Sequence, residues 1–393
     1  MSSMPALRLI EGGPQFEEVL PAHVSVSETE EHSLHRAVPF PEAGTPGLCG
    51  YLIRKYTEAG NVVLDPFCGS GATTLQAALM GRIAFGSDVD PLCTFISAAK
   101  LAPADLAEVT LRLQRTNHNR PVDLRGYQET MGHFFHIETY RELLGLRAAL
   151  EAKPDRVSRF IELMILGILH GQTSGCLSAS TMATLAFTPE QQARFNLERR
   201  QVPEVRKVVP RILTRAAHVG RDGGFAVLEK LEERHRIVER DARDLGCFSN
   251  SSVDLVLTAP PLPVESDSHV GLWLKRWYVG VDEAKVAGKI KRFSSIDDWE
   301  LFMNEFLMEG ARIVKRRGRI ALDLHDVRVG TKEYQLDRIV ENMVESELKR
   351  YFEVEGTFVH DEPFARLSPT SRRRDSGPIG KAHRVLILKR RAS

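Results

Sequence analysis

The stretch 61-NVVLDPFCGSG-71 decides the fold of this 393-residue chain. An apolar run of the kind found in buried strands leads directly into a turn that contains two glycines, Gly69 and Gly71. Glycine has no Cβ, so its backbone can turn tightly and approach a ligand closely. A strand, a glycine-rich turn and a helix in this order are typical of the first crossover of a nucleotide-binding sheet. We therefore expect a ligand site at the carboxyl end of this strand.

Strands and helices alternate on the carboxyl side of the turn. The expected helix 72-ATTLQAALMG-81 ends at a glycine, which is a common helix terminator. A second strand, 82-RIAFGSDVDP-91, and a second helix, 92-LCTFISAAKLA-102, follow it. This alternation indicates a parallel sheet covered by helices, and therefore an α/β fold.

The alternation stops after residue 102. Residues 103–235 show helical periodicity without a convincing strand pattern, which predicts a helical insertion. Strand-like runs return from residue 236 onward, so we expect residues 35–102 and 236–393 to form one α/β domain. Residues 1–34 are acidic and lack clear periodicity, and we expect them to be loosely ordered.

Positive charge is concentrated in three segments, although the whole chain has a formal net charge of only +1. From Arg199 to Arg221, seven Lys or Arg side chains stand against one acid. The other two segments are Lys285–Arg292 and Arg372–Arg374. Each segment is either a solvated face or a set of contacts for the phosphates of a nucleic acid.

The five cysteines have spacings that fit neither a zinc site nor a disulfide framework, so we expect free thiols and no metal. The chain has 42% hydrophobic and 27% charged residues, and it contains no apolar run long enough to span a membrane. The pattern of a secretory leader is also missing. We therefore expect a cytoplasmic protein that does not contact membranes.

The glycine turn lacks the features of a phosphate site. It has no third glycine of the dinucleotide fingerprint, and no Lys-Ser/Thr pair follows it. A nucleoside without phosphates instead requires acids at the ends of the strands. Asp88 is placed to accept hydrogen bonds from ribose hydroxyls, Asp241 from an adenine amine and Asp65 from an ammonium group. Together these acids predict a site for S-adenosylmethionine.

Four stretches carry a resemblance to a known family: 38-VPFPEAGTPGLCGYLIRKYT-57, 61-NVVLDPFCGSGATTLQAALMGRIAFGSDVDP-91, 240-RDARDL-245 and 253-VDLVLTAPP-261. In these stretches the chain resembles the S-adenosylmethionine-dependent DNA methyltransferases that modify exocyclic amines. The resemblance implies a seven-stranded, mostly parallel, Rossmann-like methyltransferase sheet, with the large helical insertion as a possible target-recognition region. It also implies DNA as the partner, in a setting such as restriction-modification. The cofactor-binding residues that it implies are Asp65, Pro66, Phe67, Gly69, Gly71, Asp88, Asp241 and Ala242.

The turn 258-TAPPLP-263 falls where that family has its catalytic turn. In the family, a polar residue, two prolines and an aromatic residue follow one another. The polar side chain and the first proline carbonyl accept hydrogen bonds from the target amine, and the aromatic ring stacks on a flipped base. Here the catalytic positions are Ala259, Pro260, Pro261 and Leu262, so both the polar and the aromatic side chain are missing.

Other side chains near the turn are candidates for the missing groups. Trp273, Trp277 and Tyr278 offer aromatic rings, although packing in a helix core is the favoured interpretation for them. Thr258 or Glu265 would offer an acceptor.

Three functions remain open from the sequence. The first is a DNA amino-methyltransferase that acts on the 4-amino group of cytosine or the 6-amino group of adenine at a specific site. The second is a methyltransferase of the same fold that acts on RNA or a small molecule. The third is a non-catalytic module that keeps the cofactor pocket as structure and holds nucleic acid.

Overall fold

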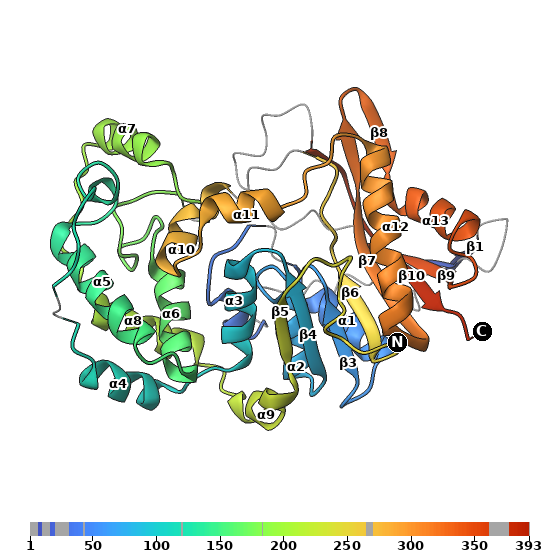
Figure 1. Ribbon diagram of the computed structural model, residues 1–393, viewed down its shortest axis with the longest axis horizontal. Coiled ribbons are helices and arrows are strands. Elements are labelled where there is room, and N and C mark those ends of the chain that lie inside the picture. Colours follow the sequence, from blue (N-terminus) through green and yellow to red (C-terminus); the bar gives the residue numbers. More distant parts are fainter. Residues whose placement is uncertain are drawn as a thin grey trace, which may run out of the picture.

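A ten-stranded sheet forms the centre of the molecule (Figure 1). The computed structural model describes residues 7–9, 16–19, 31–41, 44–118, 121–182, 184–264, 270–360 and 377–392. The order of the strands is β1-β2-β9-β10-β7-β6-β3-β4-β5, and β8 pairs with β7 outside this path. The strands are β1 (Leu7–Leu9), β2 (Phe16–Val19), β3 (Val62–Asp65), β4 (Ile83–Asp88), β5 (Arg236–Glu239), β6 (Val253–Thr258), β7 (Val314–Val329), β8 (Lys332–Gln335), β9 (Phe352–His360) and β10 (Gly377–Arg390).

Seven of these strands form the sheet that the sequence predicts. The strands β5, β4, β3, β6 and β7 are parallel to their neighbours in this order. β10 is antiparallel to both β7 and β9 and lies between them. The prediction of a mostly parallel, Rossmann-like sheet is therefore confirmed. Because the carboxyl ends of parallel strands meet at one edge, β3, β4 and β6 bring residues from distant parts of the chain to the same place.

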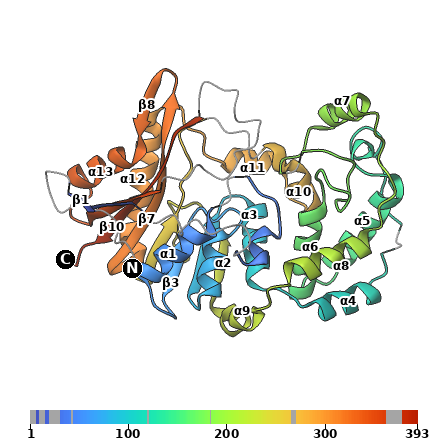
Figure 2. The same ribbon diagram turned by 180° about the vertical axis from the view of Figure 1, so that it is seen from behind.

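Helices cover both faces of the sheet (Figures 1 and 2). Apolar side chains of α1, α2 and α3 pack with Val63, Ala84 and Leu257 on one face. Those of α12 and α13 pack with Leu64 and Val256 on the other face. The α-helices are α1 (Pro46–Tyr56), α2 (Ala72–Leu79), α3 (Pro91–Leu101), α4 (Leu106–Arg115), α5 (Ile137–Glu151), α6 (Arg156–Ile168), α7 (Pro189–Arg199), α8 (Val208–Val219), α9 (Phe225–Leu231), α10 (Trp273–Tyr278), α11 (Glu283–Lys289), α12 (Ile296–Ile313) and α13 (Leu336–Ser346).

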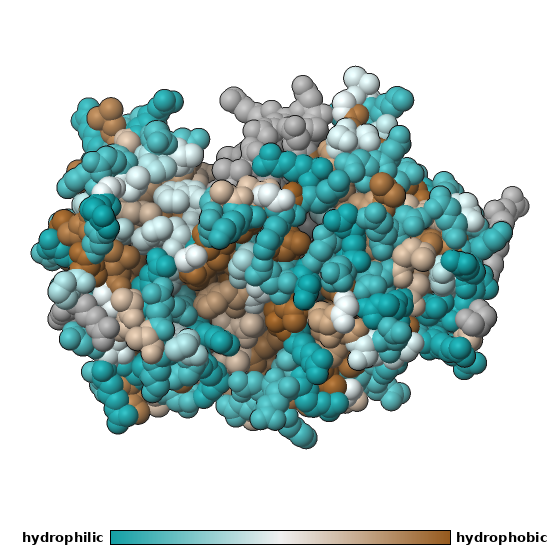
Figure 3. Space-filling model, in the orientation of Figure 1, coloured by the Kyte–Doolittle hydropathy of each residue, from teal (hydrophilic) through white to brown (hydrophobic). Residues whose placement is uncertain are grey.

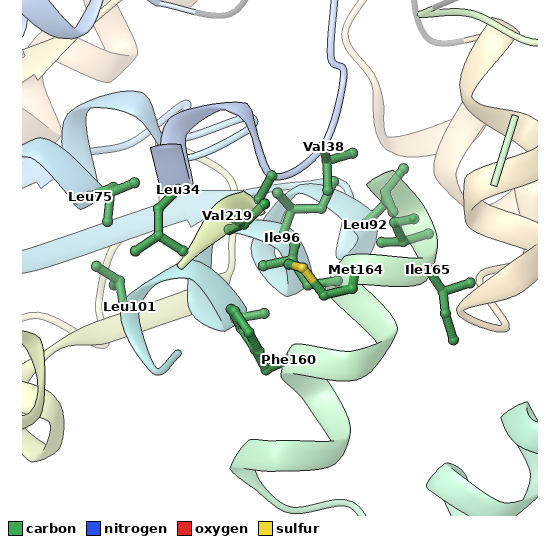
Figure 4. Close-up of a cluster of buried hydrophobic side chains, with 14 of the residues drawn as sticks. Leu34, Val38, Leu75, Leu92, Ile96, Leu101, Phe160, Met164, Ile165 and Val219 are labelled. Carbon is green, nitrogen blue, oxygen red and sulfur yellow. The ribbon is translucent and has the colours of Figure 1, made fainter. Parts of the chain in front are cut away.

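The helices α4 to α8 lie beyond the β5 edge of the sheet, in the green part of Figure 1. They are joined to the sheet domain by an apolar contact between α3 and α6. Figure 4 shows Leu92 and Ile96 of α3 close to Phe160 and Met164 of α6, and all four side chains are buried. The helical segment therefore shares one continuous core with the face of the sheet that α1, α2 and α3 cover.

Two short strands lie in the described part of the amino-terminal segment. β1 and β2 lie within residues 1–34, and β2 pairs in parallel with β9. These two strands and β8 raise the strand number from the expected seven to ten. Their short length explains why no periodicity is visible, because a strand of three or four residues contains at most two alternations.

Helix α10 connects the helical segment to the cofactor half of the sheet through two buried cations. Lys275 donates to His170 Nε2 over 2.7 Å and to the carbonyl of Thr184 over 2.9 Å. Arg276 forms an ion pair of 2.8 Å with Asp90, and both side chains are at most 5% exposed. Asp90 also caps α3 by accepting from the N–H of Leu92. The Arg276 contact thus fixes the loop at the end of β4.

The substitution Arg276→Met should lower the free energy of unfolding by about 3–5 kcal/mol, because it leaves the Asp90 carboxylate buried without its cation. The double variant Arg276→Met with Asp90→Asn should lose less, because asparagine is neutral and still caps a helix. Urea unfolding followed by circular dichroism measures both. Arg240→Met is the matched control, because Arg240 is 56% exposed in a loose pair with Asp244. A loss in Arg276→Met as small as in this control would contradict the expectation.

Candidate active site

The glycine turn begins at Asp65, the last residue of β3. Gly69 and Gly71 have φ angles of +48° and +81°, in the left-handed region that favours glycine. The turn is closed by a hydrogen bond of 2.7 Å from the N–H of Gly71 to the carbonyl of Cys68. A Cβ on Gly71 would lie 2.8 Å from Ser97 Oγ, so α3 leaves no room for a side chain there.

A buried lysine binds the backbone of the glycine turn. Lys100, at the end of α3, donates to the carbonyl of Ser70 over 2.7 Å and to that of His35 over 3.1 Å. Burial, with a smaller contribution from the charge of Arg215, lowers the pKa of Lys100 to about 7. Lys100 is not among the site residues that the sequence predicts. A lysine inside an apolar helix, 92-LCTFISAAKLA-102, is the signal that would have found it.

Two of the predicted acids lie at adjacent strand ends. Asp65 is 6% exposed, and burial raises the pKa of its carboxyl to about 6 although hydrogen bonds from Thr258 and the N–H of Phe67 oppose the rise. Asp88 ends β4, and burial likewise raises its pKa to about 6. Its carboxylate accepts from the N–H of Gly69 over 2.9 Å, which ties the second strand end to the glycine turn.

The third acid, Asp241, follows β5 and is bound by Arg243. Two hydrogen bonds, of 3.0 and 2.9 Å, join the guanidinium to both carboxylate oxygens. Partial burial alone would raise the pKa of Asp241, but the hydrogen bonds and charge of Arg243 outweigh it and lower the pKa. Arg243 also pairs with Glu305 of α12 over 2.9 Å. The carboxylate therefore stays ionised, and Ala242 beside it is 2% exposed.

The remaining predicted cofactor residues pack into the sheet. Pro66 is buried, and its carbonyl accepts from Ser87 Oγ over 3.2 Å. The ring of Phe67 lies against Phe306 and Phe302 of α12, with 5.4 Å between the first pair of ring centroids. Phe67 therefore contributes to the core beneath α12, and its backbone N–H binds Asp65.

The Pro-Pro turn lies directly beside the glycine turn. Thr258, the last residue of β6, donates from its hydroxyl to Asp65 Oδ1 over 2.6 Å. Trp299 of α12 donates from Nε1 to the carbonyl of Pro261 over 2.9 Å. One end of the turn is thus tied to the cofactor strand and the other to α12. Trp299 was missed because 38 residues separate it from the turn.

The side chains of the turn match the sequence analysis. Ala259 is exposed, Pro260 is buried, and Leu262 packs its apolar side chain against the core under α12. The hydroxyl of Thr258 donates its hydrogen to Asp65, and the Thr258 side chain is buried. Glu265 lies outside the described residues.

The aromatic residues of α10 belong to the helix core, as favoured from the sequence. Trp273 packs edge-on against Phe134 and donates to the carbonyl of Phe187 over 2.9 Å. Trp277 stacks on Tyr140, with ring centroids 5.8 Å apart. Tyr278 is 1% exposed, so none of the three rings replaces the aromatic residue of the turn.

Part of the charge between Arg199 and Arg221 serves the fold. Arg206, Arg211 and Arg215 donate to backbone carbonyls of neighbouring segments. The exposed cations of this segment are Arg199, Arg200, Lys207 and Arg221. Figure 3 shows that hydrophilic and hydrophobic side chains are mixed on one face of the helical segment.

Of the other two basic segments, only Lys285–Arg292 lies within the described residues. In Lys285–Arg292 the three lysines form ion pairs, with Asp282, Glu239 and Asp298 respectively. Arg292 is exposed. Arg372–Arg374 lies outside the described residues.

The described part of the chain contains neither a cluster of metal-ligating side chains nor a membrane-spanning helix. Its His, Cys, Asp and Glu residues form no group of three or more that would hold a metal ion. None of its helices is long and apolar enough to cross a bilayer. All five thiols are free.

An alanine at Gly71 should destabilise the fold more than an alanine at Gly69. Both variants impose a left-handed backbone on alanine, at a cost of about 1–3 kcal/mol each. Only Gly71→Ala also meets Ser97, and overpacking of this kind adds about 1–3 kcal/mol. At Gly69 the nearest atoms are 3.9 Å from the added Cβ. Equal midpoints of urea unfolding in the two variants would show that the contact with α3 does not constrain the turn.

Comparison with known proteins finds similarity over the segment that contains the glycine turn. The sequence model of a family described as DNA methylase matches residues 11–96. The Type II methyltransferase M.MjaII of Methanocaldococcus jannaschii is 30% identical over 86 residues, which are 22% of this chain and 16% of that protein. The Type II methyltransferase M.BsoBI of Geobacillus stearothermophilus is 33% identical over 70 residues, which are 18% and 14% of the two chains.

The alignments thus span less than a fifth of each of these two relatives. Among solved structures, an rRNA methyltransferase from Streptomyces viridochromogenes covers 93% of this chain and 94% of its own, with 14% identity and a TM-score of 0.32. A likeness of that size carries no argument about function. The matched segment contains the glycine turn, Asp65 and Asp88, and it supports S-adenosylmethionine as the cofactor. Over residues 11–96 the chain is therefore similar to DNA methylases, and the two Type II methyltransferases match it over parts of their length only.

Proposed function

We propose that the protein transfers a methyl group from S-adenosylmethionine to an exocyclic amine of a DNA base, at a specific site. The target amine is the 4-amino group of cytosine or the 6-amino group of adenine. The observation that carries this proposal is the hydrogen bond of 2.6 Å between Thr258 and Asp65, which joins the Pro-Pro turn to the glycine turn. It supports a common site in which the methyl donor and the amine meet.

The residues around the glycine turn fit the proposed cofactor. Asp88 and Asp241 would accept from the ribose and the adenine, and the charge of Asp65 would attract the ammonium of the methionine part. The N–H of Ala242 and the backbone of Gly69 and Gly71 would lie against the nucleoside. When bound, the cofactor supplies a methyl group on a sulfonium, which is a good leaving group. No phosphate is present in this ligand, in agreement with a turn that has no Lys-Ser/Thr pair.

The turn would hold the amine by its backbone. The carbonyl of Pro260 would accept a hydrogen bond from one N–H of the amine, and the carbonyl of Ala259 is a further acceptor on the turn. Acceptance from both N–H groups favours a nitrogen that is pyramidal and has a localised lone pair. Pro260 and Pro261 restrict the backbone, and Trp299 holds the carbonyl of Pro261. Positioning of this kind avoids reorganisation during the reaction. Leu262 would contact the flipped base with an apolar side chain.

Phosphate contacts are proposed for the exposed part of the basic segments. Arg199, Arg200, Lys207 and Arg221 are the candidates on the helical segment, which would be the target-recognition region. Arg292 and Arg372–Arg374 are further candidates. Each phosphate contact adds to affinity and makes it depend on salt. A protein that methylates a specific site in this way would fit a restriction-modification system.

A second candidate function is supported by Ala259 and Leu262. A turn without its polar and aromatic side chains also suits an acceptor other than a DNA base, in RNA or in a small molecule. The same two residues suit a relative that binds nucleic acid without methylating it. Methyl transfer to DNA, to RNA or to neither polymer separates these functions.

Label from methyl-labelled cofactor should enter DNA and not RNA, and should be found as N4-methylcytosine or N6-methyladenine at one short sequence. Mass spectrometry of digested nucleosides, and mapping of the modified positions, give the base and the site. Asp65→Ala should abolish the transfer, because it removes the charge beside the methionine part and the partner of Thr258. Circular dichroism checks that this variant is folded. Label in RNA alone would favour the second function, and cofactor binding without label in either polymer would favour the non-catalytic one.

Cofactor affinity should fall as the pH is lowered from 7 to 5. Asp65 and Asp88 have pKa values of about 6 in the free protein. Below this pH the carboxyls take up protons, and a neutral carboxyl neither attracts a cation nor accepts as strongly from a hydroxyl. We expect a loss of about tenfold or more in affinity, and a flat profile above pH 7.

Isothermal titration calorimetry with S-adenosylmethionine measures this profile. Asp88→Asn should bind more weakly at pH 7 and show a shallower dependence, because one of the two titrating groups is gone. Asp244→Asn is the matched control, because the Asp244 side chain is 75% exposed. An affinity that does not change between pH 5 and pH 7 in the unaltered protein would disprove the assignment of these acids.

A further inference from the structure

Strand β7 carries an acid, Asp323, next to the position of the Pro-Pro turn that has no polar side chain, Ala259. β6 and β7 are parallel, and Thr258 pairs with Leu322 at the end of β6. β7 continues beyond this point to Val329. Extending the register by one residue sets Asp323 beside Ala259. Neighbouring strands are about 4.8 Å apart, so a side chain on one strand reaches the space above the end of the other.

The alternation of side chains shows which face of the sheet Asp323 occupies. Leu322 and Leu324 are at most 1% exposed in the core under α12 and α13. Ala321 is buried on the opposite face, under α1. Successive residues of a strand point to opposite faces, so Asp323 lies on the α1 face. Asp65 shares this face, because it follows Val63 by two residues.

The charges of Asp65 and Asp323 both act on a buried thiol of α1, Cys49. Burial raises the pKa of Cys49 to about 12, and the charges of Asp65 and Asp323 act in the same direction. Cys49 belongs to α1 and lies 3.6 Å from the hydroxyl of Thr73 at the start of α2. Asp323 therefore borders the same space as the acid that faces the methionine part of the cofactor. Its side chain is half-buried, which leaves part of it accessible.

We propose that Asp323 is the side-chain acceptor for the target amine, replacing from β7 the polar group that position 259 lacks. Asp323 has this role only if the chain transfers methyl groups to an amine, as proposed above. A carboxylate suits the task, because hydrogen bonds to an ionised acceptor are stronger than those between neutral groups.

The amine and the sulfonium account for every electron pair in the methyl transfer. The lone pair of the amine nitrogen forms the new N–C bond to the methyl carbon. The electron pair of the breaking C–S bond stays on sulfur, which becomes a neutral thioether. The nitrogen becomes positively charged and releases one proton to water. During the transfer the Asp323 carboxylate accepts a hydrogen bond from that N–H and stabilises the developing positive charge, while the carbonyl of Pro260 accepts a hydrogen bond from the other N–H.

The test compares single-turnover methyl transfer to DNA in the full chain and four variants. Asp323→Ala should slow the transfer ~100-fold or more, which is the size of effect found when one preorganised hydrogen-bonding group is removed. Asp323→Asn should be slowed less, because its amide oxygen still accepts. Adding Ala259→Ser to Asp323→Ala should recover ~10-fold, because the serine restores an acceptor on the turn itself. Glu333→Gln on β8 is the control, because Glu333 is 60% exposed in a surface pair with Arg328.

Cofactor affinity separates a catalytic from a structural role. The affinity of Asp323→Ala should stay within ~3-fold of the unaltered protein, because an interaction made only in the transition state changes the rate and not the binding. A normal rate in Asp323→Ala, or a loss of rate matched by an equal loss of cofactor binding, would overturn the proposal and leave the function intact. Absence of methyl transfer in the unaltered protein would overturn the function and this role together.

Discussion

The hydrogen bond from Thr258 to Asp65 is the contact on which the site depends. Its two residues are 193 positions apart, and they meet because β3 and β6 are neighbours in the sheet. Asp65 is buried, so its carboxylate requires a donor, and Thr258 supplies one at the point where β6 ends. The contact has a second effect. It fixes the start of the Pro-Pro turn relative to the glycine turn, so that two loops from distant parts of the chain keep one geometry.

Much of the fold follows from local sequence patterns. The elements β3, α2, β4 and α3 appear in the predicted order. Each of these elements is set by periodicity and by glycine within a short window. The long antiparallel β10 and the pairing of β2 with β9 are different, because they depend on partners far away in the sequence. Local patterns carry no information on which strand becomes a neighbour.

The site shows the same division. Asp65, Asp88 and the glycine turn stand at strand ends that the sequence marks clearly. Their supports do not: Lys100 beneath the turn and Trp299 behind the prolines act through contacts that only the folded chain creates. The basic run from Arg199 to Arg221 shows the opposite error. A run of positive charges in the sequence suggests an exposed surface. In the structure, however, Arg215 and Arg206 donate hydrogen bonds to backbone carbonyls and so do not face solvent fully.

The structure also explains why this turn tolerates Ala259. The backbone acceptors of the turn are positioned by groups that do not include residue 259: the two prolines limit rotation, Thr258 ties one end and Trp299 ties the other. A polar side chain at position 259 would add only a hydrogen-bond acceptor, and Ala259 is exposed. An acceptor from a neighbouring strand would leave the backbone of the turn unaltered. β7 is a neighbour of β6 and runs past its end, so the proposed role of Asp323 requires no change in the turn itself.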